Sequence, residues 1–145
     1  MSALGLVALV LGILLFIALL FALILIPVSR RARRLRAELE AELGSAIERI
    51  ENTRGLGLES RGATQTRGNG WLVLTPGELR FRQWIPDRET RIPRADVTGV
   101  ETPKSWLGKS VGTKLLCVRW PGDAMAWEVR DLDAWLAALS SDPRA

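Results

Sequence analysis

The sequence contains no histidine and only one cysteine, Cys117. A single cysteine cannot build a disulfide framework, and a chain without histidine has neither a Cys/His zinc site nor a Ser-His or Cys-His nucleophile pair. No pair of carboxylates shows a catalytic spacing, because Asp131 and Asp133 are accounted for by the capping of a helix. The sequence therefore predicts a protein that is not an enzyme and that carries no cofactor and no metal site.

Charged residues are also absent from the N-terminal part of the chain. Residues 3–28 carry no charged side chain, and all 20 basic and 16 acidic residues lie between Arg30 and Arg144. Such a run exceeds the roughly 20 apolar residues that a helix needs to cross a bilayer. It is apolar on every side, unlike a surface helix of a small soluble domain, and it lacks the basic start and the cleavage site of a signal peptide. We therefore expect residues 1–29 to form an uncleaved transmembrane anchor.

A cluster of arginines follows this anchor, whereas no lysine or arginine precedes it. Basic residues beside a span are retained in the cytoplasm. We therefore predict a single-pass protein of the cell (inner) membrane with its N-terminus outside and its C-terminal part in the cytoplasm. This topology signal alone accounts for the cluster, but its members are also candidates for contact with anionic lipid, at about 1 kcal/mol each. They are Arg30, Arg31, Arg33, Arg34 and Arg36.

Residues 30–54 are rich in Arg, Glu, Ala and Leu, which are strong helix formers. Apolar side chains recur in this segment at spacings of three and four and form one narrow stripe: Leu35, Leu39, Leu43, Ile47 and Ile50. The pattern predicts a juxtamembrane amphipathic helix over residues 30–54. Its stripe has two possible partners, either a second copy of the chain, in a homodimer through residues 35–50, or the domain that follows.

Residues 55–145 have the pattern of a mainly β domain. Short apolar or alternating runs predict strands at 71–75, 79–85, 89–92, 97–101, 114–120 and 124–129, with turns at Pro76-Gly77 and Pro121-Gly122. After Asp131, a suitable N-cap, apolar residues including Trp135 recur at helical spacing. We expect this C-terminal helix to cover a strongly bent sheet, with Trp135 in the core.

Several stretches of this domain resemble the GRAM and bacterial PH-like families: 70–75 (GWLVLT), 79–81 (LRF), 91–93 (RIP) and 96–101 (DVTGVE). The resemblance covers roughly residues 60–140. It implies a seven-stranded bent sheet or partial barrel with a C-terminal capping helix. It also implies binding of proteins, peptides or phosphoinositides. The basic signature of phosphoinositide-binding PH domains is not clear here, because only Arg61 and Arg67 flank the first strand of the pattern.

The loop around Trp106 contains the other candidate contact residues, Lys104, Trp106 and Lys109. Its sequence suits a tip that dips into a bilayer while the lysines meet head groups. It equally suits a loop that folds back on the barrel. Arg80, Arg82 and Arg91 are expected on a solvated face of the sheet, and the small excess of basic residues does not favour nucleic acid as a partner.

These patterns predict a membrane-anchored cytoplasmic PH-like module that acts as a protein-interaction scaffold for a partner that the sequence does not name. The alternative is a module that senses anionic lipid at the inner leaflet. The scarcity of lysine relative to arginine also favours a bacterial source.

The predicted topology is testable with reporter fusions. A reporter that works only in the cytoplasm, fused after Ala145, should be active in the wild-type protein. Neutral replacements of all the arginines between residues 30 and 36 should mix the two orientations, because the cytoplasmic retention signal is removed. Activity of a periplasm-specific reporter at the same position in the wild-type protein would contradict the predicted orientation.

Overall fold

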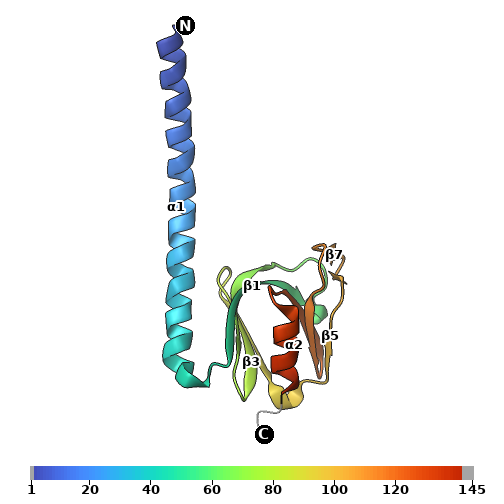
Figure 1. Ribbon diagram of the computed structural model, residues 1–145. Coiled ribbons are helices and arrows are strands. Elements are labelled where there is room, and N and C mark those ends of the chain that lie inside the picture. Colours follow the sequence, from blue (N-terminus) through green and yellow to red (C-terminus); the bar gives the residue numbers. More distant parts are fainter. Residues whose placement is uncertain (1, 142–145) are drawn as a thin grey trace. The chain divides into compact units, whose positions relative to one another are not determined.

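The chain begins with one long helix. The computed structural model describes residues 2–141, and helix α1 runs from Ala3 to Leu43 (Figure 1). The apolar side chains of its N-terminal part are exposed, and this part is long and apolar enough to cross a membrane. The chain divides into two compact units within α1. The first unit ends at Arg34 and the second begins at Leu35.

Helix α1 ends earlier than the sequence pattern predicts. A 3-10 turn, Gly44–Ala46, follows Leu43, and strand β1 occupies Arg49–Leu58. The prediction of helix for residues 44–54 is therefore wrong, and the sheet begins at Arg49, ahead of the domain boundary predicted at residue 55.

The backbone around Gly44 explains this early end. Gly44 has a φ of +52°, a left-handed conformation that commonly terminates helices. Beyond the turn, the Glu48 amide donates to the carbonyl oxygen of Leu74 at 2.8 Å. Strand pairing thus replaces the next helical turn, although Ile47 and Ile50 still pack with the apolar residues of the helix.

The second unit is a seven-stranded antiparallel sheet with one short helix. Its strand order is β4-β3-β2-β1-β9-β8-β5. The remaining strands of the sheet are β2 (Gly68–Leu74), β3 (Glu78–Gln83), β4 (Arg88–Pro93), β5 (Gly99–Glu101), β8 (Leu116–Trp120) and β9 (Asp123–Glu128). A separate hairpin pairs β6 (Ser105–Trp106) with β7 (Lys109–Ser110), and α2 spans Leu132–Ser140. The mainly antiparallel sheet and the C-terminal helix agree with the sequence prediction.

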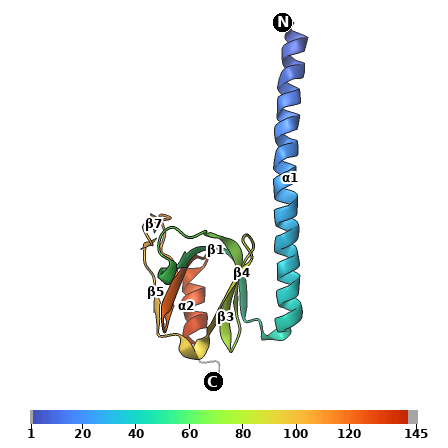
Figure 2. The same ribbon diagram turned by 180° about the vertical axis from the view of Figure 1, so that it is seen from behind.

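Helix α2 closes the inside of this sheet. It lies between the β1–β3 side and the β5 side of the unit in both views (Figure 1 and Figure 2). The Asp131 carboxylate accepts a hydrogen bond from the Ala134 amide at 3.0 Å, as expected for an N-cap. Trp135 is fully buried with Phe81, Trp127 and other residues of the inner core, and its indole N–H donates to Glu51 Oε2 at 2.6 Å.

Glycines in β1 and β2 allow the strands to pack closely against neighbouring side chains and backbone. A Cβ atom on Gly55 would lie 2.6 Å from the Phe81 ring, and one on Gly70 would lie 2.4 Å from the Arg82 carbonyl oxygen. Strand β1 pairs with β2 along residues 49–55 and with β9 near its C-terminal end. Gly55 thus lies at the strand position that joins the two halves of the sheet.

Two separate elements cover the outer face of the sheet. Leu35 and Leu39 of α1 are buried against Trp71 and Val73 of β2, which is the second of the two partners expected for the stripe. The β6–β7 hairpin covers a different apolar cluster, formed by β1, β8, β9 and the residue before β8. The outer face between these two covers is where β1 and β9 meet.

Replacing Trp135 tests the role of α2. Trp135→Ala should lower the free energy of unfolding by about 3–5 kcal/mol, because it leaves a cavity in the inner core. Denaturant titration of the full chain in detergent, followed by circular dichroism, measures the change. Trp135→Phe, which keeps most of the apolar volume and loses the hydrogen bond to Glu51, should cost less. A loss below about 1 kcal/mol for Trp135→Ala would show that α2 does not close the sheet.

Candidate functional site

Arg80, which was expected on a solvated face, is only 2% exposed. Its guanidinium donates to Glu42 Oε2 and to Glu78 Oε1, each at 2.8 Å, and lies 3.4 Å from Glu89 Oε1. Burial by itself lowers the pKa of Arg80, but the hydrogen bonds to Glu42 and Glu78 outweigh it and hold the pKa above its ordinary value. Arg80 therefore stays charged and joins the end of α1 to β3. The expectation of a solvated Arg80 is wrong.

Four other arginines of the sheet domain also have carboxylate partners within 4 Å. These pairs are Arg82 with Asp87 and Glu89, Arg91 with Glu78 and Glu89, Arg94 with Glu48, and Arg119 with Glu59 and Glu101. The positive charges of these arginines are balanced by carboxylates within the domain. These arginines therefore do not form a free positive surface.

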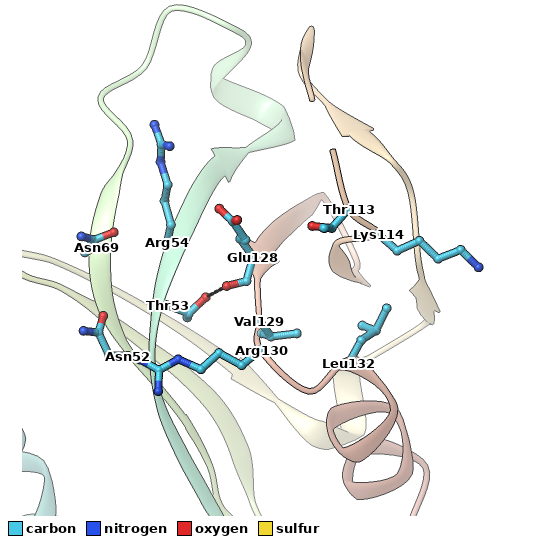
Figure 3. A pocket seen from close by; sticks show the side chains of 10 residues that line it. All are labelled: Asn52, Thr53, Arg54, Asn69, Thr113, Lys114, Glu128, Val129, Arg130 and Leu132. Carbon is cyan, nitrogen blue, oxygen red and sulfur yellow. Dashed lines mark hydrogen bonds between the residues drawn. The ribbon is translucent and has the colours of Figure 1, made fainter. Parts of the chain in front are cut away.

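Three other basic residues differ in this respect. Arg54, Lys114 and Arg130 are exposed, and none of them has a carboxylate partner within residues 2–141. All three line one cavity of about 590 Å³ on the outer face. We call these three residues the basic rim. Figure 3 shows that they extend from different elements around the cavity: from β1, from the segment before β8, and from the segment between β9 and α2.

The cavity wall offers hydrogen-bonding groups beside these charges. Asn52 and Asn69 present amides from β1 and β2, and Thr113 presents a hydroxyl. The Thr53 hydroxyl donates to the backbone oxygen of Glu128 (Figure 3), which ties β1 to β9 at the base of the site. Glu128 is the one carboxylate among the lining residues. The site therefore combines an excess of positive charge with neutral donors, which suits an anionic ligand that also has polar groups.

The β6–β7 hairpin adjoins this site and contains the three loop residues singled out from the sequence. Lys104 and Lys109 are exposed, but Trp106 is only 7% exposed. Its indole N–H donates to the Gly57 carbonyl oxygen at 2.9 Å, and its ring packs in the apolar cluster with Leu56. The loop therefore folds back on the sheet, and its indole is not presented to solvent.

The hairpin also connects to the basic rim through the backbone. The Leu115 amide donates to the Pro103 carbonyl oxygen at 2.8 Å. This bond places the residue before Lys104 beside the residue after Lys114. Lys104 thus lies in the chain segment that is tied to the basic rim, whereas Lys109 lies across the hairpin in β7.

The five arginines predicted beside the membrane divide between the two units. Arg30, Arg31, Arg33 and Arg34 belong to the first unit, and Arg36 belongs to the second. The guanidinium of Arg36 stacks on the Trp71 ring, 5.1 Å from its centroid, and donates to Glu40 at 2.7 Å. Arg36 therefore contributes to the packing of α1 on the sheet.

Groups for metal binding or nucleophilic chemistry are scarce. Within residues 2–141, no group of three or more His, Cys, Asp or Glu side chains is placed to hold a metal ion. Cys117 is fully buried in the middle of β8, and desolvation raises the pKa of its thiol to about 11. A thiol with this pKa is protonated at neutral pH and is a poor nucleophile.

The sequence analysis missed the basic rim. Arg54 fell in a predicted helix, and Lys114 and Arg130 lie at the ends of predicted strands. Their positions at strand ends were a weak signal that they lie on a rim. The sequence held no sign that these cations lack carboxylate partners of the kind that Arg80, Arg82 and Arg91 have.

Comparison with known proteins gives information on the fold only. No protein-family model and no curated protein matches the sequence. Among solved structures, the chain resembles the crystal structure of the C-terminal domain of an unknown protein from Leishmania infantum. The match has a TM-score of 0.55 and 16% sequence identity, and it covers 77% of this chain and 95% of that domain. At this identity the likeness shows a shared fold and nothing about function.

Proposed function

We propose that the chain is a single-pass protein of the cell (inner) membrane whose cytoplasmic PH-like domain is a protein-interaction scaffold. The cavity with the basic rim binds an acidic segment of a partner protein. The observation that carries this proposal is the contrast in pairing. Carboxylates pair with Arg80, Arg82, Arg91, Arg94 and Arg119, whereas Arg54, Lys114 and Arg130 gather around one cavity without such a partner within residues 2–141.

The strand order supports a PH-like assignment. A continuous antiparallel sheet of seven strands is followed by one C-terminal helix that covers its inside. These are the features that the resemblance to the GRAM and bacterial PH-like families implies. The residues that carry this resemblance, such as Leu72, Leu74, Phe81 and Ile92, are buried in the inner core.

The composition of α1 supports the membrane anchor and its orientation. Its exposed apolar side chains have no protein partner in the structure of residues 2–141, and a bilayer would cover them. The arginines that follow them favour a cytoplasmic location for the sheet domain.

The shape and chemistry of the cavity favour a protein segment as its ligand. A volume of about 590 Å³ accommodates a few side chains, and a flat bilayer surface would not reach into a concavity. Carboxylates of the partner would make charge-assisted hydrogen bonds with Arg54, Lys114 or Arg130, while Asn52 and Asn69 are suited to bond its peptide groups. The alternative function in lipid sensing loses its aromatic anchor, because Trp106 is buried.

Photo-crosslinking in cells tests this function. A photoreactive residue in place of the exposed Asn69 should trap a discrete protein on the full-length chain. Arg54→Glu combined with Lys114→Glu should reduce this adduct about tenfold or more, because two charge-assisted hydrogen bonds are replaced by repulsion.

The matched control is Arg61→Glu combined with Lys109→Glu. It makes the same change in net charge at exposed residues that do not line the cavity, and it should leave the adduct unchanged. Adducts of lipid alone would favour lipid sensing. No adduct at all, or an equal loss in the control, would contradict the proposed site.

A further inference from the structure

The turn between β3 and β4 exposes an apolar side chain that the fold does not use. Ile85 is 56% exposed. Within residues 2–141 and outside α1, Val100 at 37% is the other large apolar residue with high exposure. The Gln83 side-chain amide donates to the Ile85 carbonyl oxygen at 3.1 Å, which fixes the backbone of the turn while the Ile85 side chain remains in solvent.

The packing of residues 35–43 shows which end of the sheet holds this turn. Arg36 stacks on Trp71, and the Trp71 ring lies 5.9 Å from the Trp84 ring, centroid to centroid. Toward the other end of the same helical segment, Glu42 pairs with Arg80, near the turn between β2 and β3. The second unit therefore begins at the end of the sheet where Trp84 leads into the β3–β4 turn.

Only a short length of chain separates the start of the second unit from the apolar run. Val28 ends the apolar run, and Leu35 begins the second unit seven residues later, within one continuous helix. Seven residues of helix span only about 10 Å. The head-group layer adds about 5–7 Å on each side of the hydrocarbon core. The second unit therefore begins only a few ångström of helix beyond the head-group layer when the apolar run occupies the hydrocarbon core.

The charges around the turn also suit an anionic bilayer. The Asp87 carboxylate lies 2.9 Å from the Arg82 guanidinium, so its negative charge is balanced. Arg88, which follows the turn, is exposed and has no carboxylate partner within residues 2–141. The exposed Ile85 suits the apolar interior of a bilayer, and the neighbouring Arg88 suits its anionic head groups.

We propose that the β3–β4 turn is a membrane-contact loop that inserts Ile85 into the leaflet that α1 enters. Arg88 meets anionic head groups at the same place. The bilayer is the occupant because the anchor holds it within reach of every copy of the chain, whereas another partner must arrive by diffusion. This contact rests on the membrane anchor of the proposed function, but it uses neither the cavity nor the basic rim.

Spin labelling of the full chain tests the contact in vesicles that contain phosphatidylglycerol. A nitroxide on the Ile85→Cys variant should collide freely with oxygen, which enters bilayers, and lose most of its collisions with a water-soluble nickel chelate. Cys117 does not compete for the label, because it is buried and its pKa is raised to about 11. The matched control is a label on Val100→Cys in β5, which should remain accessible to nickel.

A second pair of variants distinguishes insertion of the native Ile85 side chain from insertion of the label itself. A nitroxide on Arg88→Cys, with Ile85 intact, should be partly shielded from nickel, and adding Ile85→Ser should remove this shielding. Unchanged circular dichroism shows that each variant is folded. Equal nickel access at positions 85 and 100, or shielding at position 88 that survives Ile85→Ser, would overturn the proposal.

Discussion

The packing of the last two turns of α1 on β2 is the contact on which the rest of the structure depends. Leu35 and Leu39, each 4% exposed, cover Trp71 and Val73, which would otherwise form an apolar patch on the outer face. The same segment supplies a carboxylate for the buried Arg80. The helix that carries the apolar run is thus part of the core of the sheet domain. The second unit begins at Leu35, inside the helix that carries the apolar run.

Charge pairing divides the surface of the domain into two kinds of region. Burying the Arg80 guanidinium costs desolvation energy, which the surrounding carboxylates offset. Glu42, Glu78 and Glu89 pair with arginines of the sheet, so these carboxylates do not neutralise the basic rim. The basic rim is left with an excess of charge beside neutral amides. Because the cations of the basic rim form no ion pair within residues 2–141, they can pair with the acidic segment of the proposed partner.

Much of the fold could be predicted from local sequence. Short apolar and alternating runs located six of the seven strands of the sheet but missed β1, and Asp131 with the spacing around Trp135 predicted α2 and its buried face. The end of α1 could not be predicted, because residues spaced by three and four fit a longer helix as well as a helix, turn and strand that bury the same cluster. The candidate site was harder still. Arg80 alternates like an exposed residue, and the pairing of each cation depends on which strands become neighbours.

The most direct test compares two soluble fragments, residues 35–145 and 44–145, by denaturant unfolding. If the end of α1 belongs to the core, the longer fragment folds and the shorter one loses about 3–6 kcal/mol of unfolding free energy, because two buried leucines are worth about 1.5–3 kcal/mol each. Leu35→Ser with Leu39→Ser in the longer fragment should reproduce most of this loss. Equal unfolding midpoints for the two fragments would contradict the account, because the helix end would then lie on the sheet without stabilising it.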